Sequence, residues 1–365
     1  MKTVKIKDIA QVEMGLSPKG ESYNFDGNGL PLLNGPTEFG TIYPNCTLYT
    51  TDSKRESEVN DLIFCVRGST TGKMNFSDKK YSLGRGVCAI RGKNYIVTKY
   101  IKYALDKYLK SLLQFANGGT FPNLCRDDIL NFEIPFNNHE KVVKFLSNYD
   151  DLIENNNRRI KILEEMAQKI YKEWFVDFKF PGHETTTIKE SVLSSIITPI
   201  KGKNITKSKA KIGNVPVVGG GIEPAYYHNV ANTQAPVITI SASGANAGFV
   251  NLYYKDIWAS DCSYIDATMT NYIYYIYLLL KNNQIEITNM QLGAAQPHVY
   301  PRDLVNLKIK EFPIEVIANF EKMISPIFEN IKVLSNKNKN LKQTRDILLP
   351  RLISGEINVE NMEVL

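Results

Sequence analysis

Residues 68–73 (GSTTGK) form a glycine-bounded loop that is similar to a phosphate-binding motif. A nucleotide-binding P-loop needs four residues between its glycines and a Ser or Thr after the lysine, whose hydroxyl reaches the magnesium ion. Here three residues separate the glycines, and Met74 follows Lys73. A related loop at residues 243–248 (SGANAG) has no lysine. The spacing therefore argues against nucleotide hydrolysis at either loop.

Other catalytic and metal-binding motifs are also missing. The four histidines are His139, His183, His228 and His298. They show neither HExxH nor HxE spacing, and the sequence has no GxSxG nucleophile motif. We find neither an NPPY-like tetrapeptide, with which an adenine methyltransferase stacks a flipped base, nor an FxGxG turn. The five cysteines form no CxxC pair, so we expect neither a zinc knuckle nor a disulfide framework. The sequence predicts a binding protein without catalytic residues, cofactor or metal.

Length and composition describe a folded chain of more than one domain. The chain has 365 residues, of which 43% are hydrophobic and 22% charged, and these values exclude wholesale disorder. Its net charge of +6 allows a polyanionic partner without requiring one. We expect a cytoplasmic protein, because the N-terminus has no signal-peptide core and the longest apolar stretch, residues 272–280, is too short to span a membrane.

Short motifs recur in the same order in two halves of the chain. Residues 63–72 (IFCVRGSTTG) match residues 239–248 (TISASGANAG), and residues 118–122 (GGTFP) match residues 293–297 (GAAQP). Each half contains short β-branched and aromatic runs punctuated by Gly, Asn and Pro, which is typical of mixed α and β structure. The pattern predicts two copies of one α+β domain.

A long helix with a heptad seam is expected after each copy. Apolar residues alternate at steps of four and three along both segments. The predicted seam positions are Val142, Leu146, Tyr149, Ile153, Asn156, Ile160, Leu163, Ala167, Ile170 and Trp174 in the first helix, and Ile317, Phe320, Ile324, Ile327, Ile331, Leu334, Asn338, Leu341, Arg345 and Leu348 in the second. Asn156 and Asn338 are predicted to fix the register of the pair.

We expect the two helices to pair with each other as an antiparallel coiled coil. Forty helical residues extend about 60 Å, which is longer than a domain of roughly 130 residues can cover. The alternative is that each helix lies on the surface of its own domain. A helix stop and a polar stretch at residues 180–187 place the linker between the copies. The predicted segments are domain 1 (1–136), the first spacer helix (137–180), the linker (181–187), domain 2 (188–311), the second spacer helix (312–358) and a C-terminal tail (359–365).

The duplicated domains, the heptad helices and two closing motifs carry a family resemblance. The motifs are residues 170–178 (IYKEWFVDF) and residues 348–356 (LLPRLISGE), which close the first and second helices. With these features the chain resembles the DNA specificity subunit of type I restriction-modification systems, the HsdS family, over essentially its whole length.

The resemblance implies that this chain binds DNA and that separate subunits carry out catalysis. Each domain is then a target recognition domain that binds one half of a split sequence in double-stranded DNA. The helices act as a spacer and as the docking surface for two methyltransferase subunits, while a motor subunit performs translocation and cleavage. A rigid spacer sets a half-site separation of one to two helical turns, roughly 35 to 70 Å.

Candidate DNA contacts under this resemblance are basic, amide and hydroxyl side chains on glycine-bounded loops. Lys and Arg suit phosphates, while Arg, Asn and Gln can pair with base edges. The candidates are Lys19, Arg67, Ser69, Thr70, Lys73, Arg85, Asn117 and Thr120 in the first copy, and Lys201, Lys203, Ser243, Asn246, Gln296 and His298 in the second. Tyrosines at 226–227 and 272–277 can contact DNA or pack in the core, and packing is favoured.

Divergence between the copies predicts an asymmetric target, since Arg67 in one loop matches Ser243 in the other. Two other functions are considered. An enzyme with unrecognised motifs predicts turnover by the isolated chain. A protein-interaction adaptor predicts that duplex DNA is not bound in a salt-dependent way.

Overall fold

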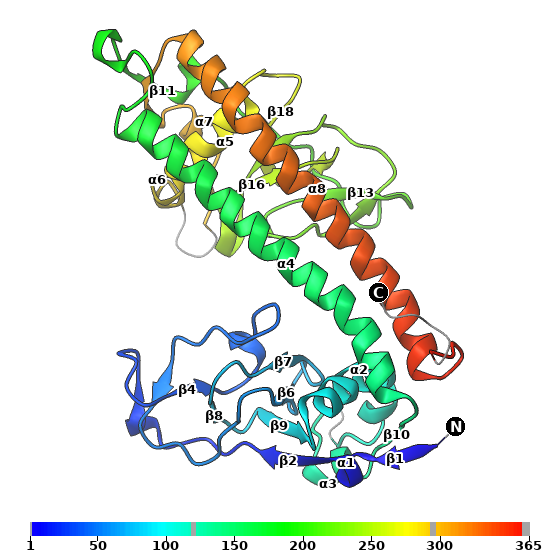
Figure 1. Ribbon diagram of the computed structural model, residues 1–365. Coiled ribbons are helices and arrows are strands. Elements are labelled where there is room, and N and C mark those ends of the chain that lie inside the picture. Colours follow the sequence, from blue (N-terminus) through cyan, green and yellow to red (C-terminus); the bar gives the residue numbers. More distant parts are fainter. Residues whose placement is uncertain (1, 118–121, 293–296, 360–365) are drawn as a thin grey trace. The chain divides into compact units, whose positions relative to one another are not determined.

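The structure, a computed structural model, describes residues 2–117, 122–292 and 297–359 (Figure 1). The chain forms two units, each of which combines helices with β-sheets. Unit 1 consists of Met1–Glu154 and Lys339–Leu365, and unit 2 of Asn155–Asn338. The mixed helix and strand content predicted from the sequence is confirmed.

Unit 1 contains two four-stranded sheets and a two-stranded sheet. One four-stranded sheet has the order β2-β9-β6-β7 and the other β3-β5-β4-β8, while β1 pairs with β10. All pairs are antiparallel except β4 with β8. The strands are β1 (Thr3–Lys5), β2 (Ala10–Met14), β3 (Tyr23–Asn24), β4 (Leu30–Leu33), β5 (Tyr49–Thr50), β6 (Leu62–Cys65), β7 (Met74–Phe76), β8 (Ser82–Leu83), β9 (Val87–Gly92) and β10 (Glu133–Pro135), and the helices wholly within unit 1 are α1 (Ile6–Ile9), α2 (Tyr95–Leu113) and α3 (Arg126–Leu130).

Strand β6 is buried on both of its faces, because hydrophobic layers cover the sheet on each side. Leu62 and Phe64 belong to the larger core, which includes residues of α2, and Ile63 belongs to a smaller cluster with Leu33 and Leu83. Successive side chains of a strand point to opposite faces, which explains why the run is continuously apolar.

Unit 2 has the same order of strands. Its four-stranded sheet runs β12-β18-β15-β16, a three-stranded sheet runs β14-β13-β17, and β11 pairs with β19. The pair β13 with β17 is parallel, as is β4 with β8 in unit 1. The elements are β11 (Lys189–Val192), β12 (Ile200–Lys201), β13 (Val215–Val218), β14 (Tyr226–His228), β15 (Val237–Ser241), β16 (Val250–Tyr253), β17 (Trp258–Ala259), β18 (Cys262–Asp266), β19 (Lys308–Glu311), α5 (Ile273–Asn282), α6 (Gln284–Asn289) and α7 (Pro301–Leu304).

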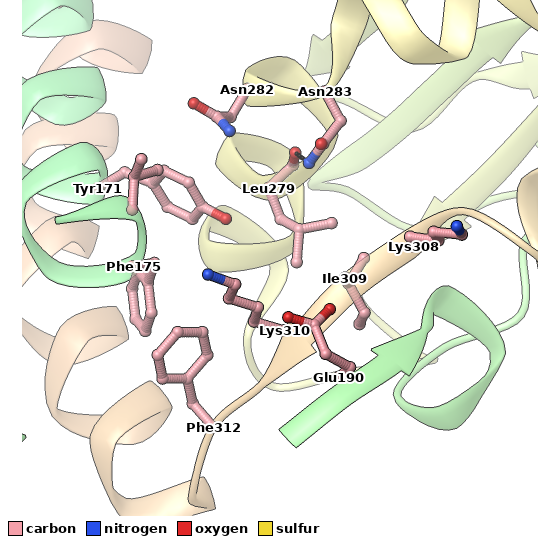
Figure 2. Close-up of a pocket in the computed structure, with 11 residues that line it drawn as sticks. Tyr171, Phe175, Glu190, Leu279, Asn282, Asn283, Lys308, Ile309, Lys310 and Phe312 are labelled. Atoms are coloured by element: carbon pink, nitrogen blue, oxygen red, sulfur yellow. Dashed lines mark hydrogen bonds between the residues drawn. The ribbon is translucent and has the colours of Figure 1, made fainter. Parts of the chain in front are cut away.

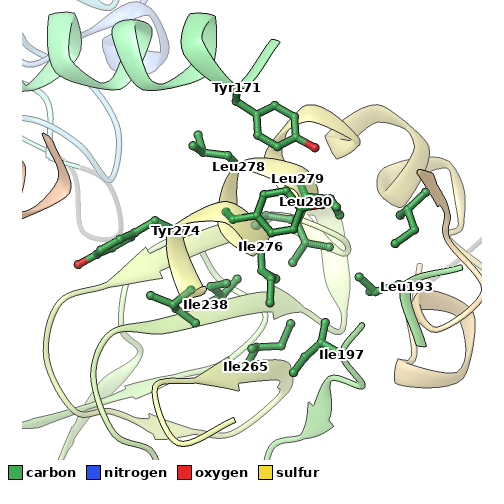
Figure 3. Packing of buried hydrophobic residues seen from close by; sticks show 14 of the residues in the cluster. Tyr171, Leu193, Ile197, Ile238, Ile265, Tyr274, Ile276, Leu278, Leu279 and Leu280 are labelled. Atoms are coloured by element: carbon green, nitrogen blue, oxygen red, sulfur yellow. The ribbon is translucent and has the colours of Figure 1, made fainter. Parts of the chain in front are cut away.

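The core of unit 2 packs helix α5 against the four-stranded sheet β12-β18-β15-β16. Figure 3 shows Ile276 of α5 above Ile238 of β15 and Ile265 of β18, with Tyr171 on the other side of α5. The predicted strands at 62–66, 87–90 and 237–240 correspond to β6, β9 and β15.

The two long helices are shorter than predicted. Helix α4 is His139–Tyr171, followed by a π-helical turn, Lys172–Val176, so the first helix does not extend over 137–180. Phe178 has a positive φ of 56°, which ends the helical path before the expected stop. Helix α8 is Ile314–Ile353 instead of 312–358, and Gly355 beyond it has a φ of 69°. Heptad periodicity marks the apolar face but does not mark where the backbone leaves the helix.

Helices α4 and α8 each contribute to both units, and they pack together within each unit. In unit 2, Leu163 and Ala167 of α4 share a core with Ile317 and Phe320 from the start of α8. In unit 1, Leu146 near the start of α4 shares a core with residues from the end of α8, Leu349, Leu352 and Ile353. The beginning of each helix thus meets the end of the other, which is the order of an antiparallel pair. Unit 1 is therefore completed by the end of α8, the helix that follows the sheets of unit 2. Unit 2 is completed by the end of α4, the helix that follows the sheets of unit 1.

Asn156 and Asn338 meet in the helix pair within unit 2. Asn156 Nδ2 donates to Asn338 Oδ1 over 2.9 Å, and Asn338 Nδ2 donates to Asn157 Oδ1 over 2.8 Å. Asn338 is only 5% exposed. A buried polar group must find a partner, so this amide network favours one alignment of the two helices.

Replacing both Asn156 and Asn338 with leucine is expected to loosen the register of the helices and the stoichiometry of assembly. The free energy of unfolding should change by no more than about 1 kcal/mol, because the Asn156–Asn338 pair is removed together and the half-buried Asn157 alone loses a partner. Light scattering of the chain assembled with its partner subunits should show a broader mass distribution. The matched control replaces Asn155 and Asn330, which are exposed on the same helices, with leucine. An unchanged assembly mass in the first variant would contradict the register role.

Candidate nucleic-acid interface

In unit 1, the turn from β6 into β7 is shaped by two glycines. Gly68 and Gly72 have φ values of +90° and +97°, a conformation that L side chains rarely adopt. The Gly72 amide donates to the Cys65 carbonyl oxygen over 2.9 Å, which closes the loop at the end of β6. The Thr71 hydroxyl lies 2.8 Å and 2.9 Å from the carbonyl oxygens of Gly68 and Pro122. The exposed predicted residues on this loop are Arg67, Ser69 and Lys73.

A second segment lies against this loop. Asn117 and Asn123 exchange both backbone hydrogen bonds, each 2.9 Å long, and the Leu124 amide donates to the Val66 carbonyl oxygen over 3.0 Å. Arg67 Nε donates to Asn123 Oδ1 over 3.0 Å. A guanidinium has five N–H donors, and this bond uses one of them while it restrains the group. The structure therefore brings the predicted residues Arg67 and Asn117 together around Asn123.

Unit 2 has the same arrangement at equivalent positions. Gly244 and Gly248 have φ values of +78° and +83°. The Gly248 amide donates to the Ser241 carbonyl oxygen over 2.8 Å, and Leu292 and His298 exchange backbone hydrogen bonds of 2.9 Å each. The backbone of this site is thus common to the two units.

The side chains on this common backbone differ between the units. Arg67 is paired with Asn123 in unit 1, and Ser243 is paired with His298 in unit 2. The Arg67 guanidinium bonds to the Asn123 amide oxygen, whereas the Ser243 hydroxyl donates to the Asp261 carboxylate, so the two loops present different hydrogen-bonding groups. The two loops thus share a backbone conformation and differ in their polar side chains.

Each glycine-bounded loop is bordered by a second turn. This turn precedes β9 in unit 1 and β18 in unit 2. The carbonyl oxygens of Gly86 and Asp261 accept amide N–H groups of the two loops, over 2.9 Å and 3.2 Å. In unit 1 the turn carries the exposed Arg85. In unit 2 the Asp261 carboxylate accepts the hydroxyl of Ser243. The charge of this turn is thus positive in unit 1 and negative in unit 2.

Three of the predicted lysines lie on other segments. Lys19 is exposed and directly precedes the 3-10 turn Gly20–Ser22. Lys201 is exposed in β12, and Lys203 follows it, with its amide donating to the Ala259 carbonyl oxygen over 2.9 Å. These residues extend the candidate surface beyond the glycine-bounded loops.

The remaining predicted contacts are less accessible or cannot be placed. Thr70 and Asn246 are half-buried within the two loops. His298 is half-buried, and its ring stacks on Tyr300 with the centroids 5.6 Å apart. Thr120 and Gln296 lie outside the described residues.

The tyrosine cluster at 272–277 contributes to packing, as favoured from the sequence. Tyr274 stacks on Phe328 with the ring centroids 4.4 Å apart, and Tyr275 is only 2% exposed. Tyr227, in contrast, is 54% exposed on β14.

Two further residues, which the sequence patterns did not indicate as candidates, lie beside these sites. Asn123 holds Arg67 in unit 1, and the guanidinium of Arg302 lies over the Tyr300 ring in unit 2, 5.0 Å from its centroid. A signal for Asn123 existed, since it follows Pro122 just as His298 follows Pro297 in the matched motif.

A separate cavity of about 220 Å³ lies in unit 2, away from these loops (Figure 2). Tyr171, Phe175 and Phe312 line one side, and Glu190 and Lys310 lie near its mouth. Burial raises the pKa of Tyr171 well above its ordinary value, so this phenol stays protonated and is unsuited to act as a base. The aromatic side chains belong to the core of unit 2.

Within residues 2–117, 122–292 and 297–359, no group of three or more His, Cys, Asp or Glu side chains is arranged to hold a metal ion. No helix in these ranges is long and apolar enough to cross a membrane.

Comparison with known proteins gives consistent matches. A family model described as the type I restriction modification DNA specificity domain matches residues 1–165. The type I restriction enzyme MjaIX specificity subunit of Methanocaldococcus jannaschii is 26% identical over 98% of this chain and 94% of its own length. The putative MjaX specificity subunit of the same organism is 31% identical over 44% of this chain and 38% of its own length. The crystal structure of a type I restriction-modification S subunit from M. genitalium has a TM-score of 0.61 at 20% identity and covers 96% of both chains.

The fold has two α+β units of related topology, each completed by a two-helix pair. Residues 1–165 match the type I restriction modification DNA specificity domain, and the chain is similar over nearly its whole length to a specificity subunit of a type I restriction enzyme.

Proposed function

We propose that this chain selects the DNA target of a type I restriction-modification complex and acts on double-stranded genomic DNA in the cytoplasm. Each unit is a target recognition domain that binds one half of a bipartite, asymmetric sequence. The observation that carries this proposal is the shared loop backbone with unlike side chains, Arg67 with Asn123 and Ser243 with His298. Base edges in the major groove are distinguished by such donors and acceptors.

The paired helices are proposed to set the spacing of the half-sites and to dock two methyltransferase subunits. Exposed apolar side chains support docking on α4 within unit 2, where Ile162 is 56% and Met166 is 45% exposed. They lie four residues apart, on one face of the helix. Two units of the same topology suit two copies of one partner.

Catalysis is assigned to the partner subunits. Adenine methylation then depends on the methyltransferase subunits, and cleavage depends on restriction subunits where these are present. This chain supplies target selection and binds no cofactor in the proposal. The first recognition domain at 1–136 and the second at 188–311 are kept as proposed functional boundaries, with α4 and α8 as the spacer helices.

Mapping adenine methylation across the genome of the source cells, with and without this gene, tests the proposal. We expect methylation at one split, asymmetric motif to be lost without the gene and restored when the gene is returned. A complex reconstituted with the methyltransferase subunits should also bind that motif more tightly than an unrelated duplex. An unchanged map together with binding that shows no preference for any duplex would overturn the proposal.

A further inference from the structure

The segment between β12 and β13 of unit 2 is unusually basic. It contains five lysines, Lys201, Lys203, Lys207, Lys209 and Lys211, and residues 200–222 include no Asp or Glu. All five lysines are exposed. We call residues 201–211 the lysine loop. In the described part of the chain, none of these five lysines forms an ion pair.

The backbone of the lysine loop is anchored to the sheets of unit 2. Trp258 Nε1 donates to the Lys203 carbonyl oxygen over 2.7 Å, and the Lys211 amide donates to Nδ1 of the buried His228 over 3.0 Å. The Tyr226 hydroxyl donates to the Ile205 carbonyl oxygen. Because these bonds involve backbone atoms of the loop, the lysine side chains are left for solvent or a ligand.

The lysine loop borders the proposed base-reading site of unit 2. The Ile205 amide lies 3.3 Å from Ser260 Oγ, with which it makes a hydrogen bond. Ser260 directly precedes Asp261, whose carboxylate accepts the Ser243 hydroxyl. A duplex that reaches Ser243 would therefore present its phosphates near the lysine loop.

Unit 1 has no comparable cationic segment at the equivalent position. Residues 15–29, which connect β2 to β4, contain one lysine, Lys19, against two acids, Glu21 and Asp26. The net formal charge is therefore −1 in unit 1, compared with +5 for the lysine loop of unit 2. The two units share a topology, but the net charge of this segment has opposite signs in them.

We propose that the lysine loop contacts DNA phosphates and that unit 1 has no equivalent contact. Electrostatic contacts of unit 2 then contribute more to DNA affinity than those of unit 1. The inference rests on the proposed function, since it assigns a role within DNA binding. Each phosphate that a lysine neutralises contributes about −0.9 to the slope of log affinity against log salt concentration. Such contacts position the protein without reading the base sequence.

The test compares salt dependence in the complex reconstituted with methyltransferase subunits. The loop variant replaces four lysines with glutamine, namely Lys203, Lys207, Lys209 and Lys211. The control variant makes the same change at four exposed lysines elsewhere in unit 2, namely Lys169, Lys172, Lys179 and Lys189. Duplex affinity is measured between about 50 and 300 mM salt, a range of about sixfold.

We expect the loop variant to lose about 3 to 4 units of salt slope and to bind about 100-fold more weakly near 0.1 M salt, on both target and unrelated duplexes. The control variant should retain the wild-type slope. Phosphate ethylation interference should lose its signal at only one half-site in the loop variant.

Two different failures are distinguishable. If the wild-type complex shows no preference for its target duplex, the proposed function fails. If the wild-type complex prefers its target but the loop variant keeps its salt slope, or the control variant loses as much, the lysine loop is not the phosphate contact. Thermal unfolding of both variants should match the wild type, because every substituted side chain is exposed.

Discussion

Replacement of Asp61 by alanine is expected to destabilise unit 1 by about 2 to 3 kcal/mol. Asp61 is 1% exposed and accepts hydrogen bonds from Nε and Nη2 of Arg91, both over 2.8 Å. It also accepts the Glu58 amide over 2.7 Å. Removing the carboxylate leaves the Arg91 guanidinium and the Glu58 amide without their partner. The Arg91 side chain is 43% exposed, so water offsets part of the loss.

Equilibrium denaturation of the full chain measures this effect. The control is Asp52→Ala, which removes an ion pair with Lys54 whose side chains are 39% and 42% exposed. Its cost should stay below about 0.5 kcal/mol. Because Asp61 directly precedes β6, partial unfolding of the Asp61 variant should impair unit 1 first. Equal losses in the two variants would contradict the assignment of the Asp61–Arg91 pair as a structural anchor.

Local patterns in the sequence predicted that the two units contain equivalent glycine loops. Gly68 and Gly72 match Gly244 and Gly248 in the repeated motifs, and all four adopt positive φ. Glycine is retained where the backbone needs this conformation, so matched glycines signal matched loops. The heptad positions were also informative, since Leu146 and Phe320 are fully buried in the helix cores.

Contacts between distant segments were not predictable in the same way. The repeated motif marks the position of Asn123, but only folding brings its side chain to Arg67. The Asp61–Arg91 pair joins the residue before β6 to a residue of β9, and a single sequence does not specify the register of these neighbouring strands. Likewise, periodicity shows that a helix has an apolar face but not that the end of α8 closes unit 1.

Replacement of Arg67 by alanine is expected to weaken binding of the target duplex by about 1 to 3 kcal/mol, or roughly 5- to 150-fold. The bond from Arg67 Nε to Asn123 Oδ1 restrains the guanidinium on an exposed loop. A restrained guanidinium suits bidentate pairing with a base edge or a phosphate. Affinity of the reconstituted complex and the methylated motif in cells measure the effect. The control is Lys110→Ala, which removes an exposed cation from α2 in the same unit and should change affinity less than twofold.

Arg67→Lys separates the two modes of contact. Lysine keeps the charge but lacks the planar fork, so a phosphate contact should be largely retained and a base contact largely lost. If Arg67 contacts a base, both Arg67 variants should accept a second base at one position of one half-site. Ser243→Ala should change the other half-site alone, and the double variant should show the sum of the two effects, because distant independent sites add. Relaxation of both half-sites by a single substitution would contradict independent recognition by the two units.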